Sequence, residues 1–107
     1  MDLYTNLNNL LEQLQTSVKS LRTTATEYAE AYKNYRVLLA KELVRLKDSG
    51  MAITLASDVA RGNEEIANAK MVEIKKEAIY KANMVSINAI KLQIKIVENQ
   101  ITREIGL

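Results

Sequence analysis

The sequence predicts an all-α fold in which two long antiparallel helices are joined by a short capping helix. The chain of 107 residues contains no proline, so no position forbids a helix. Its three glycines, Gly50, Gly62 and Gly106, fall where helices could end. Apolar residues recur at steps of three and four, the spacing of helices that pack along one face. We therefore expect one helical domain over residues 1–107.

The first long helix is expected from about Leu3 to Lys47, with Asp2 as its N-cap. Three threonines within residues 23–26 have poor helix propensity. A break at that point, with residues 1–22 as a separate arm, is therefore an open alternative. The apolar row expected to face the second long helix is Leu3, Leu7, Leu10, Leu14, Val18, Leu21, Ala25, Tyr28, Tyr32, Tyr35, Leu39, Leu43 and Leu46.

Residues 48–63 are expected to form a structured link that contains the short helix. Gly50 is predicted to adopt the left-handed backbone conformation that ends the first helix. Thr54 is expected to cap the short helix. Leu55 and Val59, four residues apart, would then pack this helix over the end of the hairpin.

The second long helix is expected from Glu64 to about Ile105, with Asn63 as its N-cap. The first half of this helix is expected to carry one apolar face, made of Ile66, Ala69 or Lys70, Ile74, Ala78 and Tyr80 or Lys81. Its second half carries two apolar rows that lie roughly 140–160° apart around the helix axis, so two of its faces need burial. One row can pack on the first helix, and the other predicts a homo-oligomer. The rows expected to supply the hairpin seam and the oligomer interface are Ile87, Ile90, Ile94, Val97, Ile101 and Ile105, and Val85, Ala89, Leu92 and Ile96.

The residue types argue against catalysis. The chain has no His and no Cys, which excludes a thiolate nucleophile, a His general base and the usual zinc sites. No glycine-rich phosphate loop is present, and no spacing of acidic residues suggests a metal site. We expect a non-enzymatic protein without cofactor or metal. The sequence also lacks a signal-peptide pattern and a long apolar run, so we expect a cytoplasmic protein without membrane contact.

Basic side chains are concentrated in two blocks. Residues 31–47 and 66–95 are both net basic, and residues 48–65 between them are net acidic. A hairpin would bring the two blocks side by side as a basic belt able to contact the phosphates of single-stranded DNA. The alternative is two solvent-exposed helix faces with ordinary ion pairs. The candidate nucleic-acid-binding residues are Lys33, Arg36, Lys41, Arg45, Lys70, Lys75, Lys76 and Lys81.

Two further features allow more than one interpretation. Tyr28, Tyr32 and Tyr35 can stack on unpaired bases, but their phase with the leucines favours a buried row. The row from Val85 to Ile96 can bind a partner helix instead of another copy of the chain. A structural or interaction module, such as a scaffold, chaperone or adaptor, is therefore the alternative to a DNA-contacting protein.

Three stretches carry a resemblance to known proteins. They are residues 27–36 (EYAEAYKNYR), residues 50–62 of the link, and the C-terminal helix rich in Ile, Leu and Lys. Together they resemble small all-helical proteins from the early region of bacteriophages and prophages of Gram-positive bacteria. Such proteins often sit beside single-strand annealing and single-strand-binding proteins. The resemblance covers roughly residues 27–105 and implies an accessory role in DNA recombination or replication, without catalytic residues.

Overall fold

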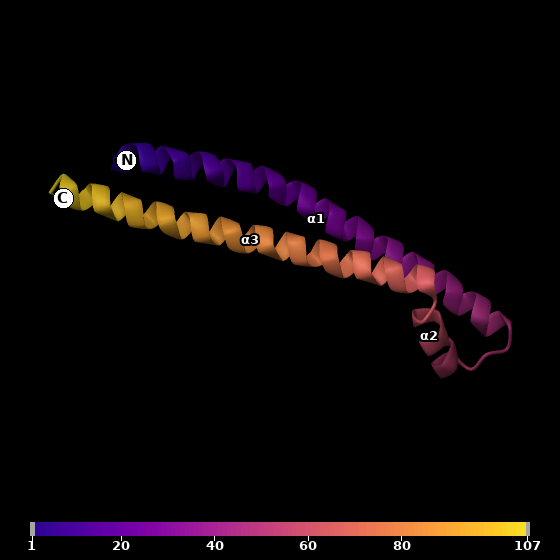
Figure 1. The fold of residues 1–107 in the computed structure, drawn as a ribbon. Coiled ribbons are helices and arrows are strands. Elements are labelled where there is room, and N and C mark those ends of the chain that lie inside the picture. The colour runs from indigo at the N-terminus through magenta and orange to yellow at the C-terminus, as the bar shows by residue number, and fades with distance from the viewer. Residues whose placement is uncertain (1, 107) are drawn as a thin grey trace. The chain divides into compact units, whose positions relative to one another are not determined.

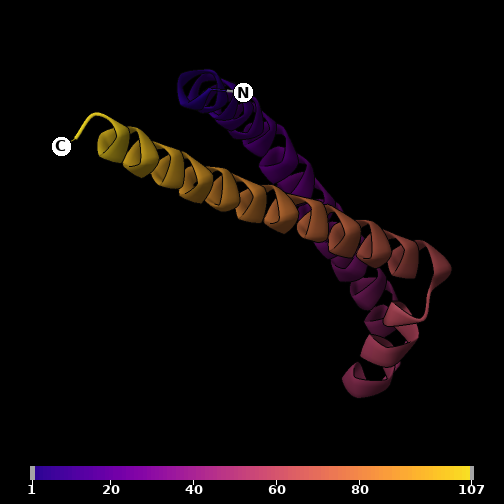
Figure 2. The same ribbon diagram turned by 60° about the vertical axis from the view of Figure 1, so that its left-hand side comes forward.

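The computed structural model describes residues 2–106, which form three helices (Figure 1). They are α1 (Leu3–Asp48), α2 (Ile53–Arg61) and α3 (Glu64–Glu104). No strand occurs within residues 2–106. The long helices α1 and α3 pack against each other in antiparallel directions, and α2 lies beside the C-terminal part of α1 in both views (Figures 1 and 2). The predicted all-α hairpin with a short third helix is confirmed.

Contacts divide the chain into two units, and each is described by itself. Unit 1 contains the N-terminal part of α1, up to Thr24, and the C-terminal part of α3, from Ile79 onward. Unit 2 runs from Ala25 to Ala78 and contains the rest of α1, all of α2 and the first part of α3. Each unit has its own apolar core.

Helix α1 begins at the predicted cap. The backbone N–H of Thr5 donates to Asp2 Oδ1 at 2.8 Å, and the Thr5 hydroxyl donates to Asp2 Oδ2 at 3.0 Å. These bonds satisfy a donor that a helix N-terminus otherwise leaves unpaired. The helix continues without interruption through residues 23–26, so the threonines do not break it.

The end of α1 has the hydrogen bonds of a Schellman motif. The Met51 N–H donates to the Leu46 carbonyl at 3.2 Å, and the Gly50 N–H donates to the Lys47 carbonyl at 3.0 Å. Gly50 has a φ of 94°, as predicted. Met51 packs against the cluster that contains Leu46, which is the apolar contact that often accompanies this motif.

Helix α2 differs from the prediction at its start and in its buried face. It begins at Ile53 after an N-cap at Ala52, so Thr54 lies inside the helix and is not its cap. Leu55 is 55% exposed, whereas Ala56 and Ala60 are 1% and 0% exposed. The expected packing through Leu55 and Val59 is therefore wrong. The alanines face inward because small side chains let the backbone of α2 approach its neighbours closely.

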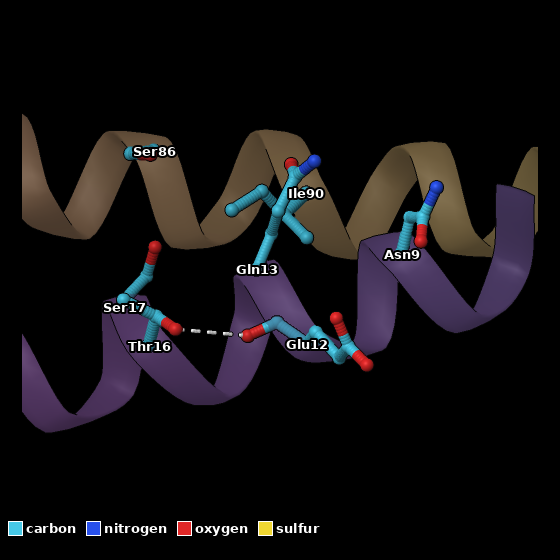
Figure 3. Close-up of a pocket in the computed structure, with 7 residues that line it drawn as sticks. All are labelled: Asn9, Glu12, Gln13, Thr16, Ser17, Ser86 and Ile90. Carbon is cyan, nitrogen blue, oxygen red and sulfur yellow. Dashed lines mark hydrogen bonds between the residues drawn. The ribbon is translucent and has the colours of Figure 1, made fainter.

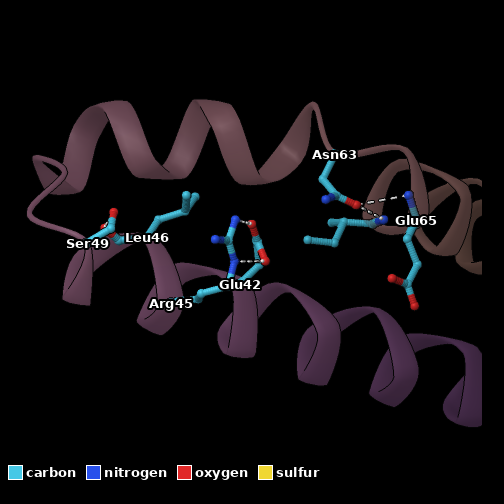
Figure 4. A network of polar contacts seen from close by, with 7 residues as sticks. Glu42, Arg45, Leu46, Ser49, Asn63 and Glu65 are labelled. Atoms are coloured by element: carbon cyan, nitrogen blue, oxygen red, sulfur yellow. Dashed lines mark hydrogen bonds and ion pairs between the residues drawn. The ribbon is translucent and has the colours of Figure 1, made fainter.

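Helix α3 begins as predicted. The side-chain oxygen of Asn63 accepts hydrogen bonds from the N–H groups of Glu65 at 3.0 Å and Ile66 at 3.3 Å (Figure 4). Glu64 and Glu65 occupy the first turn, where negative charge is favourable near the N-terminal end of the helix dipole.

In unit 1, α1 and α3 meet along a continuous apolar seam. Its buried members are Leu10, Ile90, Ile94 and Val97, with Leu3, Leu7, Leu14 and Ile101 packed around them. Ile87 is also buried, whereas Ile105 is 57% exposed. Val18, expected in this seam, is 50% exposed. The seam keeps a seven-residue repeat and reaches Ser17 after Leu14, which leaves Val18 one position outside it.

In unit 2, the core joins all three helices through Tyr35, Leu39, Leu46, Ala56, Ala60, Ile66 and Ala69. Two expected members lie outside this core. Tyr32 is 48% exposed while Ala31 is buried, and Ile74 is 55% exposed while Glu73 is only 4% exposed. In both places the neighbouring residue continues the repeat of the packed face, although it is smaller or charged.

Candidate functional site

Helix α3 presents two apolar rows with opposite exposure in unit 1. The inner row, Ile87, Ile90, Ile94 and Val97, is buried, with each member at most 8% exposed. The outer row is Val85, Ala89, Leu92 and Ile96. Val85 is 68% exposed, Leu92 60% and Ile96 48%, and Ala89 is also exposed.

Helix geometry explains this contrast. Residues that differ by three or four positions share a face, and the two rows are centred roughly 150° apart at 100° per residue. When α1 covers the inner row, the outer row points almost directly away from α1. The side chains beside the outer row include Ser86, Asn88 and Gln93, all exposed and uncharged. The outer row is thus an apolar strip bordered by polar residues, among which Lys95 is charged.

The inner row is therefore buried by α1 of the same chain. Ile87, Ile90, Ile94, Val97 and Ile101 were expected in the oligomer interface, but in the structure they belong to the seam between α1 and α3. Within the described residues, the first four are buried and Ile101 packs beside the same cluster. The outer row is the part that a further helix can reach.

Three of the eight candidate DNA-binding cations form ion pairs inside unit 2. Arg45 bonds to Glu42 with two guanidinium nitrogens (Figure 4). Lys70 Nζ lies 2.7 Å from Glu73 Oε2, and Lys76 Nζ lies 3.0 Å from Glu27 Oε2. The hydrogen bonds that Arg45 donates to the Glu42 carboxylate raise the pKa of Arg45 and lower the pKa of Glu42.

Lys70 has a second contact that holds it against the core. Its ammonium lies 4.7 Å from the centroid of the Tyr35 ring, a cation–π distance. The hydrogen bond to Glu73 is the main cause that raises the pKa of Lys70. Glu73 is buried, so Lys70 compensates a carboxylate that would otherwise be costly in this position. Lys70 therefore has a structural role.

The remaining five candidates are all exposed. Lys33, Arg36, Lys41 and Lys75 are exposed and make no ion pair with any residue in the described range 2–106. Lys75 and Lys76 are adjacent, so their side chains point about 100° apart. Because Lys76 reaches Glu27 on α1, Lys75 points elsewhere. Lys81 belongs to unit 1, whereas the other seven belong to unit 2. Of the seven cations in unit 2, three form ion pairs, and the other four are exposed and make no ion pair within residues 2–106.

A polar hollow lies between α1 and α3 in unit 1 (Figure 3). Its one ionisable side chain is Glu12, and the Thr16 hydroxyl donates to the Glu12 carbonyl at 3.1 Å. Within the described residues, no group of three or more His, Cys, Asp or Glu side chains is arranged to hold a metal ion. The hollow is lined by Asn9, Glu12, Gln13, Thr16, Ser17, Ser86 and Ile90.

One polar contact in the seam was not anticipated from the sequence. Asn83 Nδ2 donates to the Ser17 carbonyl at 3.1 Å, and Asn83 Oδ1 accepts from the Thr24 hydroxyl at 3.0 Å. The sequence contains one indication of this contact. Asn83 lies four residues before Ile87, so it continues the inner row toward the N-terminus of the helix.

In the described part of the chain, no helix combines the length and the apolar character needed to cross a membrane. Comparisons with protein-family models, with curated proteins and with solved structures each find no match to this chain. Function is therefore inferred from the chain's own surfaces.

Proposed function

We propose that this protein is a non-enzymatic helical interaction module that binds another helix through the outer row of α3. The observation that carries this proposal is the exposure of Val85, Leu92 and Ile96 on one face of a helix whose opposite face is already buried. Apolar strips of this kind, bordered by polar residues, mark protein–protein contacts. An amphipathic partner helix would supply matching side chains at steps of three and four.

The energetic argument supports a helix as the bound element. Burying the exposed parts of Val85, Leu92 and Ile96 contributes on the order of 1 kcal/mol each. Steps of four, three and four along the outer row match the holes that a facing helix presents to such side chains. The role that fits is that of a scaffold or adaptor acting in the cytoplasm.

Photo-cross-linking in the cells that naturally produce this protein tests the proposed function. A photoreactive benzophenone side chain replaces Leu92 in one variant and Lys91, on another face of α3, in a control. We expect a discrete cross-linked product at position 92 that disappears when Ile96→Asp is added. Equal products at both positions, or none at position 92, would contradict the proposal.

A second candidate function is contact with single-stranded DNA, or with a single-strand-binding or annealing protein, in phage DNA recombination or replication. The specific support is that Lys33, Arg36, Lys41 and Lys75 are exposed and without ion pairs in the described residues. Lys33 and Arg36 are three residues apart on α1, so they share a face. This pair is the strongest candidate for phosphate contact.

Titration of a labelled single-stranded oligonucleotide at several salt concentrations tests the second candidate. Reversal of both charges, Lys33→Glu with Arg36→Glu, should lower the affinity about tenfold or more. It should also reduce the slope of log affinity against log salt by about 1.4, because each lost phosphate contact removes about 0.7. Lys91→Glu with Lys95→Glu is the matched control. Equal losses of affinity in both double variants would show that the oligonucleotide is attracted by the overall charge of the chain and not by Lys33 and Arg36.

A further inference from the structure

We infer that the occupant of the outer row is a second copy of this chain, with the two α3 helices packed antiparallel about a two-fold axis. This inference rests on the proposed function, because it names the partner of the same surface. The axis passes the midpoint of the row, between Ile90 and Lys91. Three observations support it: the order of side chains along the row, the charges beside it, and the accessible area of the chain.

The outer row is complementary to itself when one copy is reversed. Val85 and Ile96 lie equally far from the midpoint, and so do Ala89 and Leu92. In the antiparallel pair, Val85 therefore meets Ile96 of the second copy, and the small Ala89 meets the large Leu92 of the second copy. A two-fold contact requires this reciprocity, because the same patch serves both copies. In a parallel pair each residue would meet itself, and the two small Ala89 side chains would leave a gap.

The polar residues beside the row also fit the antiparallel arrangement. In an antiparallel two-fold pair each flank of the row meets the same flank of the second copy, so Lys95 lies beside Asn88 of the second copy and Ser86 lies beside Gln93. The two copies of Lys95 are nine residues apart in level, about 13.5 Å along the helix axis. No like charges therefore lie opposite each other at these positions.

The accessible area of the chain leaves room for such an interface. The surface of this 12.1 kDa chain is 7771 Å², whereas a compact monomer of that mass exposes about 6,000 Å². The excess of about 1,750 Å² is roughly twice the 800 Å² that each partner buries in a standard interface. The chain therefore exposes enough area for an interface of standard size with a second copy.

Cysteine cross-linking distinguishes the two orientations, and the chain has no natural cysteine to interfere. Two single variants, Val85→Cys and Ile96→Cys, carry different affinity tags and are oxidised separately and as a mixture. In the antiparallel dimer, position 85 lies level with position 96 of the second copy. The two copies of position 85 are then displaced along the helix by about 16 Å, too far for a disulfide.

We expect a disulfide-linked product only in the mixture, and only between the two different variants. A parallel dimer would instead cross-link Val85→Cys with itself, which would overturn the proposed orientation. If the mixture gives no disulfide-linked product although sedimentation shows the protein to be dimeric, the dimer contact lies elsewhere. That result would also overturn the proposed dimer.

Sedimentation equilibrium of the full chain provides the second readout. We expect a mass twice that of the chain at micromolar concentration. Leu92→Asp should weaken the dimer about 100-fold or more, because the two-fold axis introduces the charge on both sides of a packed contact. Lys91→Asp, on another face, should leave the dimer intact, and the helix content of both variants by circular dichroism should match the parent.

The outcomes separate this inference from the proposed function. A chain that stays monomeric at 100 µM, but still forms the row-dependent photo-cross-link at position 92 in cells, would refute the second copy and keep the helix-binding function. Absence of both the dimer and the photo-cross-link would refute the two together.

Discussion

The hydroxyl of Thr24 on α1 donates a hydrogen bond to the side-chain oxygen of Asn83 on α3, 3.0 Å away. The amide group of Asn83 also donates to the Ser17 carbonyl. These two contacts form a polar layer next to the apolar seam of unit 1. A single polar residue in a helix seam specifies register at a cost in stability, because only one alignment satisfies its hydrogen bonds.

Replacement of Asn83 tests this role. We expect Asn83→Leu to raise the free energy of unfolding by about 1 kcal/mol, because an apolar side chain suits the seam better. The Thr24 hydroxyl keeps a hydrogen-bond acceptor in this variant, since it also lies 3.2 Å from the Leu21 carbonyl. Urea denaturation measures the change, and Asn68→Leu at an exposed position of α3 is the control. A loss of stability in Asn83→Leu would mean that the polar layer is itself stabilising.

The inner and outer rows predict losses of stability of different size for the same Ile→Ala substitution. Ile94 is 8% exposed and Ile96 is 48% exposed. We expect Ile94→Ala to lower the free energy of unfolding by about 2–4 kcal/mol, because it removes buried methyl groups and leaves a cavity. Ile96→Ala should cost less than about 1 kcal/mol in dilute protein, where the outer row is exposed to water.

Thermal and urea unfolding at two protein concentrations measure both variants. In concentrated protein the cost of Ile96→Ala should rise, since association stabilises the folded state by mass action. A cost that is the same at both concentrations would argue against association through the outer row.

The two link glycines differ in what they require of the backbone. Gly50 has a φ of 94°, and a Cβ added there would meet nothing within 4 Å. Gly50→Ala should therefore cost about 1 kcal/mol through backbone strain alone. Gly62 has a φ of −82°, and its Cβ would meet only ordinary contacts at 3.6 Å.

Gly62→Ala is thus the matched control, and it should stabilise the protein by about 0.5 kcal/mol by restricting the unfolded chain. Urea midpoints of the two variants should move in opposite directions. A shift of both midpoints in the same direction would show that the left-handed conformation of Gly50 does not determine the stability change of Gly50→Ala.

The Glu42–Arg45 pair predicts an acid-dependent contribution to stability. The hydrogen bonds that Glu42 accepts from Arg45 lower the pKa of Glu42 below the ordinary 4.5. A carboxyl group with a depressed pKa in the folded state stabilises that state above its ordinary pKa, and the contribution disappears as the pH falls through the depressed value. The contribution of the Glu42–Arg45 pair to folding stability therefore begins to fall at about pH 4.5 and continues to fall at lower pH.

Carbon NMR of the Glu42 carboxyl group measures this pKa directly. Arg45→Met should raise the pKa of Glu42 toward its ordinary value, whereas Lys47→Met, on a different face of α1, should leave it unchanged. Because the Arg45 side chain is 67% exposed, 0.5 M salt should weaken the effect. An unchanged pKa in Arg45→Met would show that the pair does not form in solution.

Where sequence and structure disagree, the disagreement has one common cause. The predicted rows followed the large apolar residues Val18, Tyr32 and Ile74, but the packed faces pass through their neighbours Ser17, Ala31 and Glu73. A helix face has a fixed direction set by the residues buried along its length, so a polar or small residue in phase is buried and a large residue out of phase is exposed. Local composition does not reveal this phase.

The candidate surfaces were predictable to different degrees. The outer row depends only on spacing along one helix, and both its membership and its distance from the inner row follow from the sequence. The grouping of the cations depends on the rotation of α1 and α3 about their axes. Only the structure shows that Lys70 and Lys76 turn toward α1, while Lys33 and Lys75 form no ion pair within residues 2–106.

The three helices, the caps at Asp2, Gly50 and Asn63, and the two apolar faces of α3 were predictable from the amino-acid sequence. These features arise from interactions within a few residues, which local propensity and periodicity describe. The packing of α2 through Ala56 and Ala60, the burial of Glu73 with Lys70 and the hydrogen bond from Asn83 to α1 emerge only in the folded chain. Those outcomes depend on which side chains from distant segments compete for the same space, a competition that arises only when the helices pack.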